Sequence, residues 1–394
     1  MPIESGPITF RRFAVEGNFP KTPEPELLDR LAAYVLEIGE HSVPDATEYG
    51  WSGGRHVFDA TFSFEHNVFA DALAFAMRID TNRVPAEVRR AYQIMEEDAA
   101  AAEGSGRKRA PRDAKQAVRD RVDQDLKSGK YRRSKLVPLL WDLPTGMIYT
   151  SASGKSLEKL HELFTRTFDG ELLPLSAGAL AHRRLESTGH RRDYEDFRPT
   201  RFAAGPDGER QAPEYPWVTK GDQAKDFLGN EFLLWLWYTA EHNGGQIATP
   251  SAGEVTILFE RVLELDCAFG FSGRDLLRGT DPTQMPEARD ALRTGKVPRR
   301  AGIRLEAGGG PYAFTFQAEQ FLCTGVKLPD VEADTPRVAV EERIALLRDL
   351  SRAIDGLFDA FLKVRASSKW EPQTSEMRRW IRQPARTPAV VAAE

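Results

Sequence analysis

The sequence predicts an α+β fold built from two α+β units and a projecting helical hairpin. Several short stretches alternate apolar and polar residues with a period of two, which is typical of half-buried strands. Other stretches repeat apolar residues at helical spacing, and the longest, from Val340 to Val364, predicts a single long helix. Two thin apolar stripes on either side of a Gly- and Ser-rich loop predict the hairpin.

The first α+β unit is expected from residues 1–83 and 131–178. Thr22-Pro23 supplies a capping residue and a proline at the start of a helix, and the Pro144-Thr145-Gly146 turn joins two of the strands. The elements expected here are strands at 8–15, 56–64, 71–79, 136–143, 147–151 and 172–175, and helices at 22–39 and 156–168.

Residues 84–130 are expected to form the hairpin. Val88 and Tyr92 belong to the stripe of its first helix, and Val118 and Val122 belong to the stripe of its second. Each stripe is too narrow to be packed on several sides, so the hairpin is expected to project from the body of the protein.

The remaining chain divides into three expected parts. Residues 179–225 are polar and rich in Arg, Pro and Gly, so they are expected to be an insertion or linker. Residues 226–335 form the second α+β unit, which opens with a helix that is apolar on most sides. Residues 336–394 hold the long helix and a peripheral tail. Strands of the second unit are expected at 254–258, 261–271, 302–306 and 312–317.

Composition narrows the class of protein. The 394 residues include 54 Lys/Arg and 59 Asp/Glu, so the net charge of −5 excludes a chain that is basic throughout. The two cysteines, Cys267 and Cys323, are not in a C-x-x-C pair, which argues against a disulfide framework or structural zinc. The N-terminus lacks the apolar segment of a signal peptide, and no apolar run is long enough to span a bilayer. A cytoplasmic protein without membrane contact is expected.

Catalytic motifs are fragmentary. Gly154-Lys155-Ser156 follows a strand and opens a helix, as in a phosphate-binding P-loop, but Tyr149 stands where that loop needs its first glycine. The seven histidines are scattered without metal-ligand spacing. Asp125-Leu126-Lys127 is a fragment of a nuclease pattern without a partner acid. We therefore expect no catalytic residue, no metal and no cofactor. A metal-dependent nuclease and a protein-binding scaffold with basic faces stay open as alternatives.

Basic charge is segregated into two stretches. Residues 104–135 carry twelve Lys/Arg against four acids, and residues 274–304 carry eight against four. Basic residues that neutralise DNA phosphates release counterions, and this release drives DNA binding that does not depend on the base sequence. A run of charged residues can also be only a solvent-exposed face of the protein. The expected DNA-binding residues are Arg107, Lys108, Arg109, Arg112, Lys115, Arg119, Lys130, Arg132, Arg133, Arg274, Arg278, Arg293, Lys296, Arg299 and Arg300.

Several short motifs follow one another in a recognisable order. They are Gly50-Trp51, Met77-Arg78-Ile79, Val84-Pro85, Trp141-Asp142, Gly146-Met147-Ile148, Leu173-Pro174-Leu175-Ser176, Arg293-Thr294-Gly295-Lys296-Val297 and Gln320-Phe321-Leu322-Cys323-Thr324-Gly325. In their order and spacing, most clearly over residues 8–178, the chain resembles the recombination-associated protein RdgC family.

The resemblance implies a horseshoe-shaped subunit that closes into a ring-shaped homodimer around duplex DNA. It implies a nucleoid-associated protein that restrains the RecA recombinase by occupying DNA without reading its sequence. The hairpin would be the tip where two subunits meet, and Tyr131 falls where the family carries a bulky aromatic residue at that contact. The family's basic residues on the second unit fall near Arg274 and Arg278 without matching one for one. The chain departs from the family in a longer polar segment, 182–220, and a longer tail, 363–394.

Overall fold

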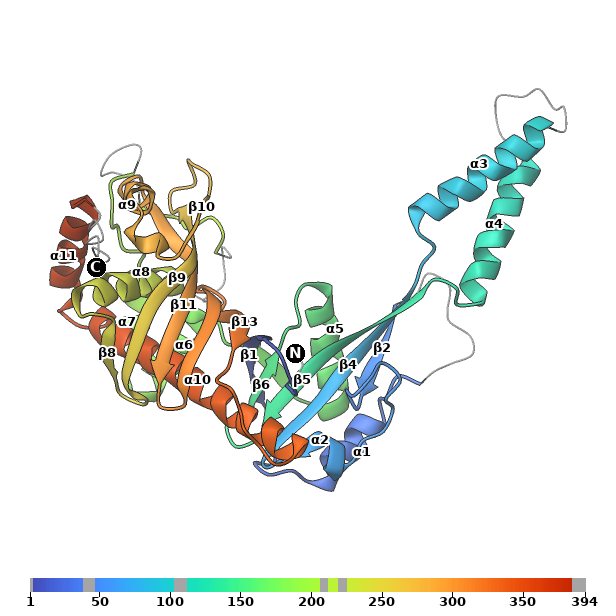
Figure 1. The fold of residues 1–394 in the computed structure, drawn as a ribbon, viewed down its shortest axis with the longest axis horizontal. Helices are drawn as coiled ribbons and strands as arrows, with labels where there is room; N and C mark the ends of the chain where they lie inside the picture. The colour runs from blue at the N-terminus through green and yellow to red at the C-terminus, as the bar shows by residue number, and fades with distance from the viewer. Residues whose placement is uncertain (1–2, 38–46, 103–111, 206–211, 219–224, 385–394) are drawn as a thin grey trace, which may run out of the picture. The chain divides into compact units, whose positions relative to one another are not determined.

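The computed structural model describes residues 3–37, 47–102, 112–205, 212–218 and 225–384 (Figure 1). The chain forms two compact units: unit 1 comprises Met1–Ala14 and Leu173–Glu394, and unit 2 comprises Val15–Leu172. Each unit combines helices with strands, which confirms the α+β class. The division differs from the expected one, because the first strand and the C-terminal helices all belong to unit 1.

Unit 1 is an antiparallel sheet with helices on one face. Its strands follow the order β10-β9-β11-β12-β13-β1, and β8 pairs with β9. The strands are β1 (Ile8–Glu16, of which residues up to Ala14 belong to this unit), β8 (Gln246–Thr249), β9 (Gly253–Cys267), β10 (Asp275–Gly279), β11 (Lys296–Ala307), β12 (Gly310–Gln317) and β13 (Leu322–Lys327). The helices are α6 (Ala177–Ser187), α7 (Arg191–Asp196), α8 (Phe227–His242), η1 (Pro282–Gln284), α9 (Pro286–Arg293), α10 (Pro336–Arg365) and α11 (Trp370–Arg382).

Helix α8 is apolar on most sides because it is surrounded. It contacts the sheet at β9 and β11 and the long helix α10. The side chain of Phe232 on α8 reaches Phe316 of the sheet and Phe358 of α10, with ring centroids 6.3 and 5.1 Å away. Burial of such rings removes large apolar areas from water and holds the helices on one face of the sheet. Cys267 and Cys323 are buried and unpaired.

The segment 179–225 differs from the expected polar linker. Its first part completes α6 and forms α7, and Tyr194, Phe197, Phe202 and Tyr215 are buried. Lys225 ends the segment with its ammonium donating to the carbonyl oxygens of Tyr194, Glu195 and Phe197. Isolated aromatic residues in a polar sequence have no periodicity, so their burial was invisible in the sequence pattern.

The described part of the tail beyond α10, up to Pro384, is also packed and not peripheral. Glu241 on α8 accepts hydrogen bonds from the indoles of Trp237 (2.6 Å) and Trp380 (3.0 Å), and from the guanidinium of Arg289 on α9. The Arg289 guanidinium lies over the Trp380 ring, 3.8 Å from its centroid. This buried cluster joins α8, α9 and α11.

Unit 2 is a second antiparallel sheet, with the order β6-β5-β4-β2 and with β3 paired to β4. Rings from the sheet and α5 form its core: Trp51 and Phe75 pack edge-on at 5.2 Å, as do Trp141 and Phe168. The elements are α1 (Pro25–Ala32), β2 (Thr47–Ser52), α2 (Phe64–Asn67), β3 (Val68–Phe69), β4 (Ala72–Asn82), α3 (Ala86–Ala102), α4 (Arg112–Lys127), β5 (Arg132–Asp142), β6 (Met147–Thr150) and α5 (Lys155–Phe168).

The strand expected at 56–64 is wrong. That stretch is irregular and leads into α2. The Asp59 carboxylate accepts hydrogen bonds from the guanidinium of Arg55 (2.9 Å) and the hydroxyl of Thr61 (2.9 Å), and these local bonds hold a loop. Side chains that bond to near neighbours in this way compete with a strand ladder.

The hairpin consists of α3 and α4 and extends beyond the ends of β4 and β5 (Figure 1). It has its own small apolar cluster of Val84, Tyr92, Val122 and Leu126. At its base the Asn82 side-chain amide donates to the Leu126 carbonyl oxygen at 2.7 Å, which fastens α4 to the end of β4.

We predict that Trp380→Ala lowers the free energy of unfolding by roughly 3–5 kcal/mol, because it empties a buried aromatic site and removes a hydrogen bond to Glu241. Urea denaturation followed by circular dichroism measures the loss. Val338→Ala, at a 39 % exposed position of α10, is the control and should change stability by less than about 0.5 kcal/mol. Equal stability of the two variants would mean that α11 is not part of the packed core.

Candidate nucleic-acid interface

The second hairpin helix, α4, presents basic side chains to solvent. Lys115 and Arg119 are exposed, lie one turn apart on the same face, and have no hydrogen-bond or ion-pair partner among the described residues. Arg112 begins the helix. The expected residues Arg107, Lys108 and Arg109 fall outside the described residues. The side chains of Lys115 and Arg119, and that of the exposed Lys127 at the end of the helix, are therefore available for an anion.

A hydrogen-bonded cluster closes the base of the hairpin. The Tyr92 hydroxyl donates to the Asp125 carboxylate at 2.5 Å, and the Lys130 ammonium donates to the same carboxylate at 3.1 Å. The hydrogen bond to Asp125 raises the pKa of Lys130 above its ordinary value. Lys130 thus has an internal partner, the Asp125 carboxylate. Asp125, which belongs to the fragment of a nuclease pattern in the sequence, is likewise bonded to Tyr92 and Lys130.

Tyr131 lies at the base of the hairpin and not at its tip. Its ring packs against the hairpin cluster, and its hydroxyl is 3.3 Å from that of Tyr92. It is half-buried, so part of the ring remains accessible. Any contact with a second subunit through Tyr131 would involve the hairpin base.

Arg132 is tied into a second network, at the end of the unit 2 sheet. The Asp80 carboxylate accepts two hydrogen bonds from Arg78 (2.9 and 2.5 Å) and two from Arg132 (2.9 and 2.6 Å). Burial raises the pKa of Asp80, but the bonds from Arg78, Ser134 and Arg132 together outweigh it, so the net pKa is lowered. The next basic residues on β5 are Arg133 and Lys135, which lie two positions apart and therefore on the same face of the strand. Both are exposed, and their side chains have no hydrogen-bond or ion-pair partner in the part of the chain that the structure describes.

In unit 1, the second basic stretch lies partly on the open sheet face, which we define as the face of β9–β13 away from α8 and α10. On β11 the buried residues Ala301 and Ile303 point to the helices, so Arg300 and Arg304 point to the open face. Arg278 on β10 is opposite Val262, next to the buried Leu263, and so points the same way. Antiparallel sheets with one packed face commonly carry such an alternation.

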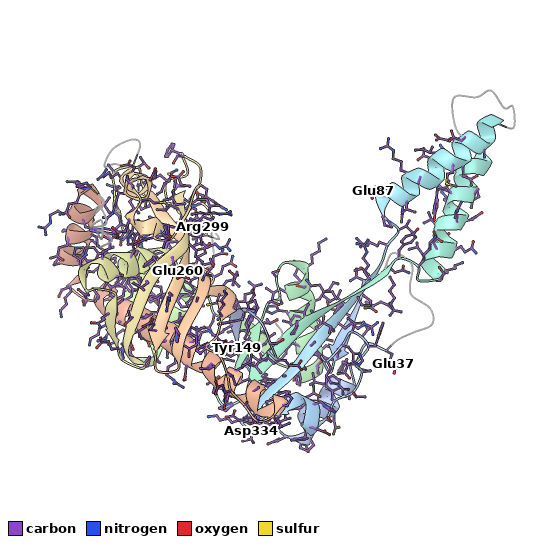
Figure 2. All side chains as sticks on the ribbon, in the orientation of Figure 1. Glu37, Glu87, Tyr149, Glu260, Arg299 and Asp334 are labelled. Atoms are coloured by element: carbon purple, nitrogen blue, oxygen red, sulfur yellow. The ribbon has the colours of Figure 1, made fainter. Side chains whose placement is uncertain are left out.

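Four carboxylates on or beside this sheet are paired with the other expected residues. Arg274 pairs with Glu264 (3.1 Å) and Asp266 (3.5 Å), and Lys296 pairs with Asp275 (2.7 Å). Arg299 pairs with Asp266 (3.1 Å) and Glu319 (2.7 Å). Figure 2 labels Arg299 on β11 and Glu260 on the neighbouring strand β9.

These pairs leave two open-face guanidiniums without a partner in the described chain, although the register places Arg300 opposite Glu264, whose carboxylate is paired with Arg274. Arg278 and Arg300 have no ion-pair or hydrogen-bond partner within the described ranges. Arg304 has only a loose pair with Glu306 at 3.6 Å, and both of these side chains are about half exposed. Arg304 and Lys135 were counted in the sequence's basic stretches but were not singled out. Their outward place in an alternating strand was the signal that could have found them.

Arg293 has a structural role that the sequence did not reveal. Its guanidinium donates to the carbonyl oxygens of Ile381 (3.1 Å) and Gln383 (2.8 Å) at the end of α11, and to Asp290 (2.7 Å). Cations at helix C-termini satisfy unpaired carbonyls and complement the helix dipole. Arg293 therefore belongs to the helical layer and not to the open sheet face.

The Gly154-Lys155-Ser156 motif forms the start of a helix. Gly154 precedes α5 with φ of 49°, and the Ser156 hydroxyl donates to the Ser153 carbonyl oxygen at 2.7 Å, which shapes an ordinary helix start. Across the described ranges, no three His, Cys, Asp or Glu side chains gather where they could hold a metal ion. None of the described helices is both long and apolar enough to cross a bilayer.

A scan of the chain against protein-family models finds no match, and a search of the curated proteins finds none. The RdgC resemblance therefore stays a prediction that rests on the order of short motifs.

We predict that Asp80→Asn lowers the free energy of unfolding at pH 7 by roughly 3–5 kcal/mol, because it leaves Arg78 and Arg132 without their shared carboxylate. The folded-state pKa of Asp80 lies below its unfolded value of about 3.9. Its stabilisation is therefore present above about pH 4 and is lost as the pH falls further. The variant should lose this part of the acid sensitivity.

Hydrogen exchange of β4 and β5 at pH 7 and pH 3, read by mass spectrometry, measures the effect within unit 2. Asp29→Asn, an exposed acid of α1 without a partner in the described chain, is the control and should match the native protein. Unchanged protection of β4 and β5 in Asp80→Asn would show that the network does not support the sheet.

Proposed function

We propose that this protein binds duplex DNA without sequence preference and without catalysing a reaction. The observation that carries the proposal is the surplus of Arg278 and Arg300 on the open sheet face, where the neighbouring acids already have basic partners. Arg304 adds a loosely paired guanidinium on the same strand as Arg300. In unit 2, the exposed side chains of Lys115 and Arg119 add further positive charge.

The chemistry of these groups suits phosphate better than bases. Guanidiniums fit phosphate oxygens with two parallel hydrogen bonds and stay charged at any physiological pH. Arg278 and Arg300 stand on β10 and β11, two strand spacings apart, which is about 10 Å across the sheet. A broad sheet face with separated arginines can follow a DNA backbone, and contacts of this kind position a protein without reading sequence.

The biological role that we propose comes from the resemblance to the RdgC family. By occupying DNA, the protein would restrain a RecA-type recombinase during recombination, as a cytoplasmic, nucleoid-associated homodimer. In this proposal two horseshoe-shaped subunits close into a ring, with contacts that include the half-buried Tyr131. Closed two-fold symmetry would bring the same patches of both subunits together.

We predict that Arg278→Ala/Arg300→Ala weakens duplex binding roughly tenfold or more at about 50 mM salt, equally for unrelated sequences. Each lost phosphate contact releases about one counterion fewer, so the plot of log affinity against log salt should become shallower by about two. Fluorescence anisotropy on two labelled duplexes of unrelated sequence, titrated between about 50 and 200 mM salt, measures both effects.

The matched control is Arg183→Ala/Arg192→Ala, which removes two exposed arginines from α6 and α7 without touching the open sheet face. It should leave the salt slope unchanged. A preference above about tenfold for one sequence, or equal effects of the two double variants, would contradict phosphate binding on the open sheet face. Cleavage of the duplex on adding Mg²⁺ would favour the nuclease alternative.

We predict that Tyr131→Ala weakens self-association roughly tenfold, because truncation of an aromatic residue at an interface centre typically costs more than 1 kcal/mol. Tyr131→Phe keeps the ring on the hairpin cluster and loses only the contacts of the hydroxyl with Tyr92 and Lys130, so it should associate like the native chain. Sedimentation velocity at micromolar concentration measures both. A native protein that sediments only as a monomer would refute the dimer.

A further inference from the structure

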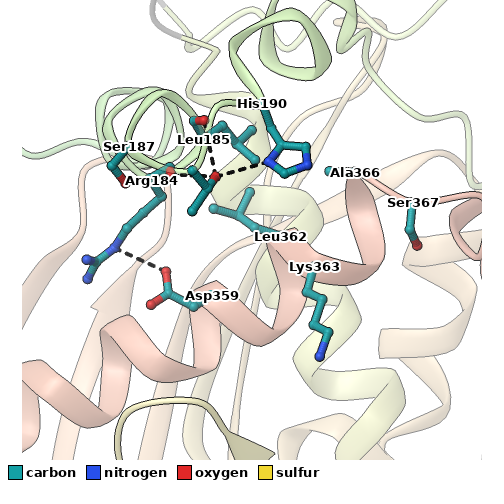
Figure 3. Close-up of a pocket in the computed structure, with 10 residues that line it drawn as sticks. Arg184, Leu185, Ser187, His190, Asp359, Leu362, Lys363, Ala366 and Ser367 are labelled. Atoms are coloured by element: carbon teal, nitrogen blue, oxygen red, sulfur yellow. Dashed lines mark hydrogen bonds and ion pairs between the residues drawn. The ribbon is translucent and has the colours of Figure 1, made fainter.

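Unit 1 contains a pocket that has no part in the proposed DNA interface. Its volume is about 530 Å³, within the range of small-molecule sites. One wall is the end of α6 and the turn that follows it, and the other is the last turns of α10 (Figure 3). The lining residues are Arg184, Leu185, Ser187, Thr188, His190, Asp359, Leu362, Lys363, Ala366 and Ser367.

The floor of the pocket is apolar. Leu185 is 7 % exposed and Leu362 is 3 % exposed, and both line the pocket, one from each wall (Figure 3). Ala366, one turn beyond Leu362, is half-buried and leaves room above the floor because its side chain is only a methyl group. Binding an apolar group here would be favourable by about 25 cal/mol for each Å² of apolar surface that is removed from water.

At one end of the pocket the charges are already paired. The Arg184 guanidinium lies 3.1 Å from the Asp359 carboxylate and 3.5 Å from that of Asp355 (Figure 3). The Asp359 carboxylate is thus neutralised. A cationic ligand would find no unpaired acid among the described lining residues.

The carbonyl groups at the end of α6, which would repel an anion, are also occupied. The Arg184 carbonyl oxygen accepts from the Thr188 amide (3.3 Å) and hydroxyl (3.0 Å), and the Leu185 carbonyl oxygen accepts from the His190 amide (2.7 Å). These bonds reduce the negative end of the helix dipole at this wall.

The other end of the rim carries positive charge. Lys363 is exposed and has no hydrogen-bond or ion-pair partner among the residues that the structure describes. In the view of Figure 3 the Lys363 side chain extends away from Leu362 and His190, and rotation about its four-carbon stem can bring the ammonium to the mouth of the pocket. The His190 ring lies on the facing wall, with Nδ1 3.3 Å from the Thr188 hydroxyl.

We propose that this pocket binds a small amphiphilic organic anion, with an apolar ring system on the Leu185–Leu362 floor and one carboxylate- or sulfonate-like group held by Lys363. The apolar floor, the neutralised acid and the unpaired lysine are three independent features that favour this ligand class over a cation or a neutral polar molecule. None of the lining residues belongs to the proposed DNA-binding set, so the site is separate from that function.

Two dyes of matched shape test the proposal on the full-length protein. The first, 8-anilinonaphthalene-1-sulfonate, has an apolar body and one sulfonate, and N-phenyl-1-naphthylamine has the same body without the charge. We expect the sulfonate to bind one molecule per chain, measured by fluorescence titration. Lys363→Gln should weaken it about two- to fivefold and leave the neutral dye unchanged, as loss of one exposed charge contact predicts. Lys369→Gln, an exposed lysine outside the lining, is the charge control and should have no effect.

Ala366→Phe should abolish binding of both dyes because the added ring occupies the space above the floor. Ala339→Phe, at another half-buried alanine of α10 away from the pocket, should preserve binding. Circular dichroism melting checks that each variant folds. If Ala366→Phe does not fold, the ratio of the two dyes' affinities in Lys363→Gln is the test of the proposal. If neither Lys363→Gln nor Ala366→Phe changes the affinity for the sulfonate dye, this pocket is not its binding site. If the native protein binds the two dyes with equal affinity, the pocket does not select an anion.

Discussion

One-sided burial of an antiparallel sheet is the constraint on which the rest of this structure depends. In unit 1 the rings of Phe232, Phe316 and Phe358 hold α8 and α10 against one face of the sheet. In unit 2 Trp51 and Trp141 hold α5 against its sheet in the same way. Once one face is committed to aromatic packing, the alternation of side chains sends every other residue of a strand to the opposite face. The outward place of Arg278 and Arg300 follows from this constraint.

The charge available to a ligand is smaller than the formal charge of the basic stretches. Arg274, Lys296 and Arg299 stand in a stretch with surplus positive charge, yet each has carboxylate partners on the sheet. Their effect on a nearby anion is indirect, because they neutralise acids that would otherwise repel it. A phosphate approaching the open sheet face therefore meets few positive groups, but it meets little opposing charge.

Shared carboxylates also explain how the sheets tolerate buried ions. Asp80 holds Arg78 and Arg132 at once, and Arg12 donates to Asp355 at 2.9 Å across 343 positions of the chain. A buried charge is costly unless it is paired and hydrogen-bonded, so each such residue depends on a partner that the fold must bring to it. The same dependence makes these arginines poor candidates for direct DNA contact.

The sequence by itself determined the α+β class, the α3–α4 hairpin, the long helix α10 and the two basic stretches, because local periodicity and composition carry that information. It did not predict the burial of Tyr194 and Trp380, since isolated aromatic residues in polar segments have no period. Only the tertiary structure decided which arginines are committed and which are unopposed, and it alone joined α6 to α10 around a pocket. The physical reason is that ion pairs, helix caps and pocket walls are made by residues far apart in the chain, and their energies depend on distances that no local pattern records.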